Sequence, residues 1–189
     1  VQSNIKAKYF GEVDFSNADV IGLDDVTIAT FNITAADTTI TLQNLEGLTS
    51  INWGDGTIDT NLSHTYTTVG TYQCKIYSVT TIGYRAFYNC GFYGSSSLTS
   101  IVIPDSVETI GNNAFYDCDG LKSFKAGSGL KTIGSYAFQY CDKLETVEIN
   151  NEKLTTIGYQ AFYNNDALKS VSISGNSVTI EQNAFQSAV

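Results

Sequence analysis

One motif recurs through the second half of the chain and constrains the fold more than any other feature: Ile-Gly, then two variable residues, then Ala-Phe. Its phenylalanines are Phe87, Phe115, Phe138, Phe162 and Phe185, at spacings of 28, 23, 24 and 23 residues. The last copy has Glu181 in place of the glycine. Repeats of about 20–50 residues indicate stacked coils, because a single unit cannot bury its own apolar face. We therefore expect a solenoid in this half of the chain.

A second recurring piece lies between the Ala-Phe turns. Its first, fourth and sixth residues are apolar, as in Leu98, Ile101 and Ile103, and it returns at 121–126, 144–149 and 168–173. Each copy predicts a short strand with these three positions facing inward. The outward positions hold Lys and Glu in alternation from one strand to the next, which predicts ion pairs and little net field on that face. The long first interval contains a Gly/Ser-rich insertion that predicts a projecting loop.

The segment from Leu98 to Phe115 reads LTSIVIPDSVETIGNNAF, and it resembles the BspA-type, or Treponema-type, leucine-rich repeat. The later coils lack the proline of this motif. The resemblance covers residues 80–189 and implies a leucine-rich-repeat solenoid of about five coils. Proteins with such repeats are common on microbial cell surfaces, which implies an extracellular or cell-surface location.

The first part of the chain, residues 1–79, shows no such period. Alternating runs at 38–42 and 71–77, separated by Gly, Asp and Asn clusters, predict an antiparallel β-sandwich. The segments WGDGT from Trp53 and SHTYTTVGTY from Ser63 resemble the PKD-type immunoglobulin-like domain. The chain as a whole is therefore expected to be mainly β, with a PKD-like sandwich fused directly to the solenoid. No linker separates the two parts, so we expect the strand at 72–77 to serve both.

The charge balance and the apolar pattern exclude two classes of partner. Ten Lys and Arg residues against 19 Asp and Glu residues give a net charge of −9, the wrong sign for a nucleic-acid binder. No stretch approaches the roughly 20 apolar residues that span a bilayer, so no membrane insertion is expected. One histidine and four cysteines without a CxxC pair leave few ligands for zinc.

Asp55 and Asp59 are the candidates for a metal site. Asp55 lies in Gly-Asp-Gly, where hairpin turn chemistry is the first interpretation and calcium ligation, shared with Asp59, is the alternative. His64 has no nucleophile or paired acid assigned by the sequence, so we interpret it as structural. Neither a catalytic residue nor a cofactor is predicted, and we expect the protein not to be an enzyme.

Three cysteines, Cys90, Cys118 and Cys141, stand three residues after successive copies of the repeated phenylalanine. Such a column permits disulfides between stacked coils in an extracellular protein. Small buried thiols also suit packing alone, and we favour that interpretation. The sequence leaves the state of Cys74 open.

Tyrosines supply the candidate binding residues. Tyr88, Tyr116 and Tyr163 follow the repeated phenylalanine, and Tyr84 and Tyr159 precede it by three residues. A repeat copies its residues in any case, but tyrosine also offers a large contact area with a polar tip, which suits recognition of proteins or sugars. Phe92 and Tyr93 lie in the insertion without an evident role in the core, and they are the first choice of contact site.

The function that follows is a non-enzymatic binding or adhesion module for an extracellular protein, matrix or glycan ligand. The alternatives are a virion fibre or decoration protein, a structural spacer, and a targeting module of a secreted hydrolase. The fifth coil carries no polar cap, so we also expect either a continuation of the repeat array beyond Val189 or a partner that covers this end.

Overall fold

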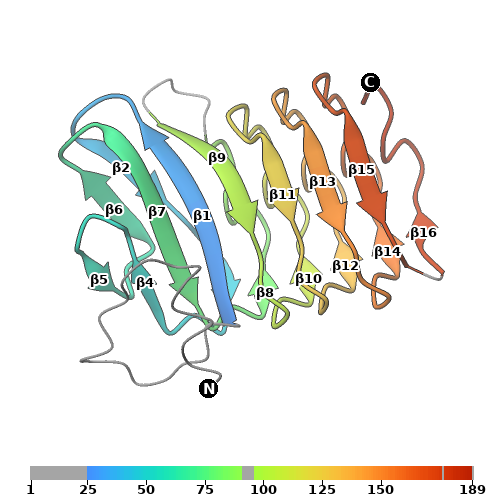
Figure 1. Ribbon diagram of the computed structural model, residues 1–189, viewed down its shortest axis with the longest axis horizontal. Coiled ribbons are helices and arrows are strands. Elements are labelled where there is room, and N and C mark those ends of the chain that lie inside the picture. Colours follow the sequence, from blue (N-terminus) through green and yellow to red (C-terminus); the bar gives the residue numbers. More distant parts are fainter. Residues whose placement is uncertain (1–24, 91–95, 176, 189) are drawn as a thin grey trace, which may run out of the picture.

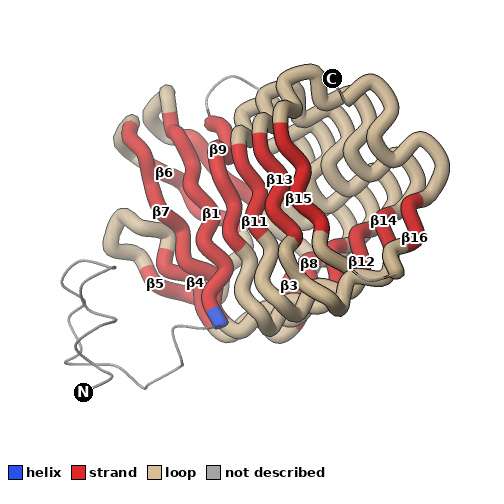
Figure 2. Tube along the Cα trace, turned by 45° about the vertical axis from the view of Figure 1, so that its right-hand side comes forward, coloured by secondary structure: helices blue, strands red, loops and turns tan. Residues whose placement is uncertain are grey.

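The computed structural model describes residues 25–90, 96–175 and 177–188, and its regular elements there are β-strands. They form an eight-stranded sheet, a six-stranded sheet and a two-stranded sheet. Figure 1 shows the strands of the second half side by side in a row, and Figure 2 shows the same segments as stacked coils. A mainly β solenoid is therefore confirmed for the repeats.

The repeats contribute four longer strands to the eight-stranded sheet and five two-residue strands to the six-stranded sheet, and both sets pair in parallel. The longer strands are β9 (Ser96–Val102), β11 (Ser123–Lys125), β13 (Thr146–Ile149) and β15 (Ser170–Ile173). The two-residue strands are β8 (Thr81–Ile82), β10 (Thr109–Ile110), β12 (Thr132–Ile133), β14 (Thr156–Ile157) and β16 (Thr179–Ile180).

The segments that follow the two-residue strands form a third wall, which we call the turn wall: residues 83–90, 111–118, 134–141, 158–165 and 181–188. Backbone amides bond each turn segment to the next, as in the 2.7 Å hydrogen bond from Phe87 N–H to the Ala114 carbonyl. The residues two before and two after each phenylalanine have φ between 52° and 61°. Asn and Asp tolerate this conformation best, which explains their frequency there.

Glycine at the start of the turn wall lets successive coils approach closely. A Cβ at Gly111 would lie 2.8 Å from the carbonyl carbon of Gly83, and one at Gly134 would lie 2.7 Å from that of Gly111. Contacts this short are not seen for real Cβ atoms, so glycine at these two positions allows the close approach of the preceding coil. In the fifth coil Glu181 stands in this place, and its carboxylate accepts a hydrogen bond from Tyr159 N–H at 2.8 Å.

The core of the solenoid is a column of stacked phenylalanine rings. Adjacent centroids of Phe87, Phe115, Phe138, Phe162 and Phe185 are 4.8–5.0 Å apart. The inward positions predicted for the strands are buried in the first and third copies, and Leu121 and Phe124 are buried in the second.

The four cysteines are buried and free. The thiols of Cys118 and Cys141 lie 3.1 and 3.2 Å from the carbonyl oxygens of Phe87 and Phe115 in the preceding coils. Burial raises the pKa of the Cys74 thiol to about 12. The interpretation of the cysteine column as packing therefore agrees with the structure.

The strands of residues 25–79 continue the sheets of the solenoid. They are β1 (Val26–Ile33), β2 (Thr38–Thr41), β3 (Leu45–Glu46), β4 (Ser50–Asn52), β5 (Ile58–Asp59), β6 (Ser63–Tyr66) and β7 (Gly70–Tyr77). β1 pairs with β9, β3 pairs with β8, and both pairings are antiparallel. On the turn wall, the Asn44 carbonyl accepts from Gly83 N–H at 2.8 Å. This region therefore covers all three walls of the solenoid at its N-terminal end.

The strands predicted at 38–42 and 71–77 are confirmed as β2 and β7, but the expectation that 72–77 serves both parts of the chain is wrong. β7 lies between β1 and β4, and β1 is the strand that borders the solenoid. The physical reason is strand pairing: β1 is hydrogen-bonded to β7 along one edge and to β9 along the other, so β1 separates β7 from the solenoid.

The fifth coil leaves apolar side chains uncovered. Val171 and Ile180 are 40% and 53% exposed, whereas Val147 and Ile157 in the preceding coil are buried. A cavity of about 290 Å³ lies here between the last long strand and the last turn segment. Phe185 and Ala188 line it from the turn wall.

Candidate functional site

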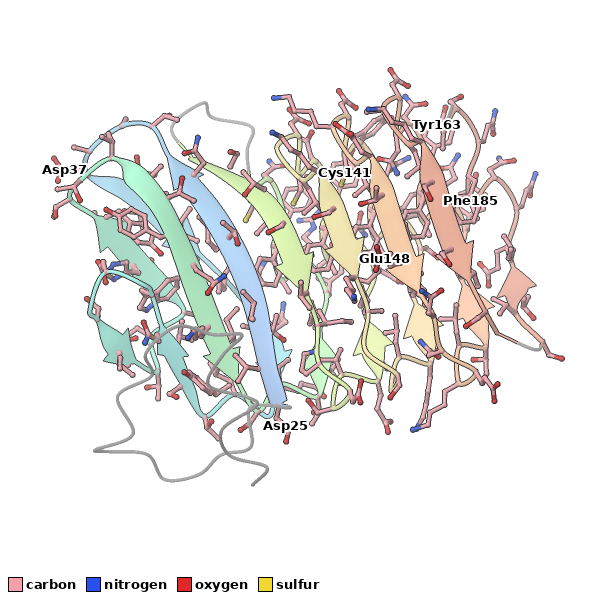
Figure 3. All side chains as sticks on the ribbon, viewed as in Figure 1. Asp25, Asp37, Cys141, Glu148, Tyr163 and Phe185 are labelled. Atoms are coloured by element: carbon pink, nitrogen blue, oxygen red, sulfur yellow. The ribbon has the colours of Figure 1, made fainter. Side chains whose placement is uncertain are left out.

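Four tyrosines on the turn wall form one row of rings across four coils. The rings of Tyr88 and Tyr116 are parallel with centroids 5.2 Å apart. Tyr140 meets Tyr116 and Tyr163 edge to face, at 5.5 and 6.2 Å. Tyr163 is labelled at the upper edge of the repeats in Figure 3. The four side chains are each partly exposed.

A second group lies on the other side of the phenylalanine column. Tyr136 and Tyr159 make an edge-to-face contact at 5.4 Å. In the first coil, the guanidinium carbon of Arg85 lies 5.0 Å from the centre of the Tyr84 ring and 4.4 Å from that of Tyr88. Arg85 thereby bridges Tyr84 and Tyr88. We call this surface the tyrosine face: Tyr84, Arg85, Tyr88, Tyr116, Tyr136, Tyr140, Tyr159 and Tyr163.

Carboxylates border the middle of this face. Burial raises the pKa of Asp117, Asp119 and Asp142. Repulsion between neighbouring carboxylates raises these pKa values further: Asp142 acts on Asp117, and Asp117 acts on Asp119. Asp119 and Asp166 both act on Asp142. Burial also raises the pKa of Tyr116, and the nearby Asp117 carboxylate contributes to that shift. A second anion brought to this part of the surface would therefore be repelled.

The opposite side of the solenoid, the outward face of β9, β11, β13 and β15, carries the predicted ion pairs. The Lys169 ammonium lies 2.8 Å from the Glu145 carboxylate, and Lys125 lies 3.4 Å from Glu148. These side chains are well exposed, so each pair contributes little to stability. The paired charges leave little net field for a charged ligand.

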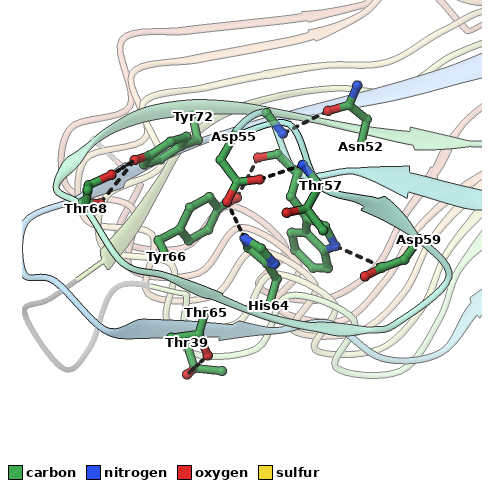
Figure 4. Close-up of polar contacts among 12 residues, drawn as sticks. Thr39, Asn52, Asp55, Thr57, Asp59, His64, Thr65, Tyr66, Thr68 and Tyr72 are labelled. Atoms are coloured by element: carbon green, nitrogen blue, oxygen red, sulfur yellow. Dashed lines mark hydrogen bonds and ion pairs between the residues drawn. The ribbon is translucent and has the colours of Figure 1, made fainter.

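His64 belongs to an aromatic cluster in the N-terminal region (Figure 4). Its ring stacks on Trp53 with centroids 5.0 Å apart and meets the edge of Tyr66 at 4.7 Å. His64 Nε2 lies 2.7 Å from Asp55 Oδ2, and the Tyr66 hydroxyl donates to the Trp53 carbonyl at 2.8 Å. The contacts of His64 thus serve to hold the turn at Asp55 against the core.

The two calcium candidates already serve as hydrogen-bond acceptors. Asp55 Oδ1 accepts from Thr57 N–H at 3.0 Å, in addition to the contact with His64. Asp59 accepts from Trp53 Nε1–H at 3.2 Å and from the backbone and side-chain amides of Asn61. In the described part of the chain, no group of three or more His, Cys, Asp or Glu side chains is arranged to hold a metal ion.

The predicted binding residues fall into three sets. Tyr88, Tyr116 and Tyr163 lie in one row, whereas Tyr84 and Tyr159 lie on the other side of the phenylalanine column. Phe92 and Tyr93 fall outside the described residues.

Sequence reasoning missed Tyr136, Tyr140 and Arg85. In the third coil the residue directly after the phenylalanine is Gln139, which is buried, and the partly exposed tyrosine is the next one, Tyr140. A search for tyrosine at both the first and the second position after each repeated phenylalanine would have found Tyr140.

The residue types of this surface are typical of recognition surfaces. Tyrosine and arginine dominate the energetics of protein interfaces, because they combine a large apolar area with hydrogen-bonding tips. The hydroxyls of partly buried tyrosines donate to and accept from a ligand while their rings lose little entropy.

Comparison with known proteins identifies the repeats. Residues 91–188 match, in six copies, the family model described as BspA type leucine rich repeat region. The chain is similar to the T. pallidum leucine-rich repeat protein TpLRR, with 31% identity and a TM-score of 0.51 over 58% of this chain and 49% of that one. The chain therefore spans about half the length of that protein. No curated protein sequence matches.

Two further solved structures resemble the chain less closely. One is a leucine-rich cell surface protein from Faecalibacterium prausnitzii, with 28% identity and a TM-score of 0.38 over 77% of this chain and 46% of that one. The other is the pneumococcal vaccine antigen PcpA, with 23% identity and a TM-score of 0.39 over 57% of this chain and 29% of that one. The described residues contain no helix long and apolar enough to cross a membrane.

Proposed function

The chain belongs to the BspA-type leucine-rich repeat family, and from this membership together with the tyrosine face we propose that it is a non-enzymatic binding module. It acts outside the cell or at the cell surface and recognises a protein, matrix or glycan ligand. The observation that supports this proposal is the row of partly exposed tyrosine rings that crosses four coils. Phe92 and Tyr93, which fall outside the described residues, remain candidate contacts.

The rigidity of the turn wall supports the same function. Each tyrosine projects from a backbone that is hydrogen-bonded to the next coil, as at Tyr140 N–H to the Tyr163 carbonyl at 3.1 Å. A ligand that binds here meets side chains already held in place, so little ordering entropy is lost on binding. The ion-paired outward sheet face offers no comparable set of aromatic side chains.

The test is binding of the full chain to an array of glycans and matrix proteins, including collagen, laminin and fibronectin. The informative variant replaces Tyr88, Tyr116 and Tyr163 with Gln, because Gln139 and Gln186 occupy the equivalent positions in other coils. The control is Lys122→Thr on the outward sheet face, where Thr99 is the equivalent residue. We expect the tyrosine variant to bind at least about tenfold more weakly and the control to bind normally.

Two outcomes would contradict the proposal. One is the absence of any ligand on the array, which would favour a spacer or a virion component. The other is equal binding by the tyrosine variant and the unchanged chain. Phe92→Ala with Tyr93→Ala tests the insertion in the same assay. We expect binding to persist in the presence of a chelator, and loss of binding there would implicate Asp55 and Asp59.

We further propose that residues 1–79 form a PKD-like unit and residues 80–189 the repeat unit, joined rigidly. The packing of Trp53, His64 and Tyr66 around the Asp55 turn supports the PKD-like interpretation. Val79 is fully buried at the junction, which supports rigidity. Limited proteolysis of the native chain should give no cut between residues 74 and 84, and an early cut there would contradict a rigid joint.

A further inference from the structure

The single arginine of the chain, Arg85, occupies a position where the fold does not require it. The equivalent residues in the next four coils are Asn113, Tyr136, Gln160 and Asn183. Arg85 has φ of 58°, a conformation that Asn adopts more readily than Arg. The coil geometry is therefore satisfied without an arginine, and the guanidinium needs another explanation.

The backbone of Arg85 is fixed on both sides. Its N–H donates to the Asn112 carbonyl at 3.2 Å, and its own carbonyl accepts from Gln43 Nε2 at 2.9 Å. The side chain then extends over the rings of Tyr84 and Tyr88, at 5.0 and 4.4 Å from their centres. Cation–π contacts of this kind hold a guanidinium in place without neutralising its charge.

Arg85 has unused hydrogen-bonding capacity. In the ranges that the structure describes, none of the ion pairs involves Arg85, and its buried Nε–H has no hydrogen-bond partner. A guanidinium with rings against its faces takes further partners in its own plane, where its N–H groups point. Because Nε is buried, a planar carboxylate from solution would pair with the two terminal Nη groups, through two parallel hydrogen bonds.

The surrounding charge limits the ligand to one anionic group. The chain carries a net charge of −9, and Asp117, Asp119 and Asp142 border the tyrosine face beyond Tyr116. Each additional anionic group on a ligand would be repelled by these carboxylates, so a ligand with one terminal carboxylate suits this surface better than a polyanion. The exposed ring of Tyr84, 51% accessible, offers an apolar face beside this charge.

We propose that Arg85, flanked by Tyr84 and Tyr88, binds the carboxylate of an acidic sugar at the end of an otherwise neutral glycan. Sugars suit this surface because they alternate apolar ring faces with hydroxyls, which match the rings and hydroxyls of the tyrosines. This inference rests on the proposed function and names the ligand class of the same surface. Arg85 is its specificity-determining residue.

The test measures binding of the full chain to sialyllactose, to a glucuronic-acid-terminated disaccharide and to neutral lactose, by titration calorimetry or NMR. We expect at least one acidic sugar to bind about tenfold or more tightly than lactose, which is the gain typical of a charge-assisted hydrogen bond. Arg85→Asn should abolish this preference, and Arg85→Lys should retain only part of it because lysine lacks the planar pair of donors.

The controls separate binding from folding. Asn and Gln occupy the equivalent position in other coils, so Arg85→Asn and Arg85→Gln should melt at nearly the temperature of the unchanged chain. Lys122→Thr, which also removes one positive charge, should leave the preference intact. That comparison distinguishes a local contact from a change in net charge.

Three results would overturn the inference. They are equal binding of acidic and neutral sugars, a preference that survives Arg85→Asn, and tighter binding of a neutral peptide with a free C-terminal carboxylate than of either acidic sugar. If array ligands are lost on changing the tyrosines but not on changing Arg85, the proposed function stands and this inference fails. If no ligand binds at all, both fail.

Discussion

Replacing Phe138 with Ala tests whether the stacked phenylalanines hold the coils together. Phe138 is fully buried, and its ring lies 4.8 Å from Phe115, 5.0 Å from Phe162 and 4.6 Å from Phe124. Phe→Ala in a core costs about 3–5 kcal/mol. Each aromatic pair adds about 0.5–1.5 kcal/mol beyond its buried area. Three ring neighbours place the expected loss at about 4–5 kcal/mol, the upper end of the range.

The matched control is Phe185→Ala, which makes the same change in the same column. Phe185 stacks on one ring of that column, Phe162 at 5.0 Å, and it is partly exposed beside the open end of the core. The substitution removes less buried apolar area than Phe138→Ala, so the expected loss is about 1–2 kcal/mol.

Urea and thermal unfolding followed by far-ultraviolet circular dichroism measure both variants. For a chain of this size the loss at Phe138 corresponds to a fall in Tm of roughly 8–20 °C. Trp53 fluorescence reports the N-terminal region separately, which shows whether the two parts unfold together. Equal losses for the two variants, or a loss below about 1.5 kcal/mol for Phe138→Ala, would refute the reasoning.

Three further predictions concern single positions. Gly111→Ala should destabilise the chain by about 1–3 kcal/mol in urea unfolding, because its Cβ would lie 2.8 Å from the Gly83 carbonyl carbon; wild-type stability would contradict this close approach. Asp117→Asn should raise Tm slightly at neutral pH, because burial and nearby Asp142 raise the pKa of this carboxyl and its ionised form therefore costs stability. The gain in Tm should vanish in acid, where the carboxyl is protonated. A lower Tm at neutral pH would contradict this prediction. Burial opposes the charge of Asp55, but hydrogen bonds from Thr57 and His64 outweigh it and lower its pKa. Its contribution is therefore present above the ordinary Asp pKa of 3.8 and is lost as the pH falls through the lowered value, so Asp55→Asn should show a smaller loss of stability in acid.

The repeat made the solenoid predictable because each coil repeats the same local requirements. The apolar positions of each short strand, the glycine of the turn and the Ala-Phe pair recur at nearly constant spacing, so one copy predicts the structure of the others. Leu144, Val147 and Ile149 are buried as the pattern predicts. The equivalent Val171 is exposed because no further coil packs on it in this structure.

The N-terminal region and part of the tyrosine face were less accessible to sequence reasoning. Alternation indicated β2 and β7, but pairing between β1 and β9 joins residues about 70 apart in the chain, and no local pattern records such a partner. Similarly, the contact of Arg85 with Tyr88 depends on side-chain directions set by the positive φ of the turn wall. The repeat spacing shows which residues occupy equivalent positions in successive coils, but it does not show which of those positions are in side-chain contact.

The pairing of β1 with β9 also determines how the molecule responds to mechanical load. Hydrogen bonds between stacked coils run along the solenoid axis, so a pull between Asp25 and Ala188 acts parallel to them and opens them one after another. Tension enters at β1 and reaches the solenoid directly through β9, while β4 and β5 lie beyond β7 and outside the shortest path. In the described part of the chain, the fifth coil packs against the fourth coil alone, so it should detach first. Under tension the chain would therefore lengthen coil by coil from that end, at a force set by a few bonds at a time, and the N-terminal region would yield last.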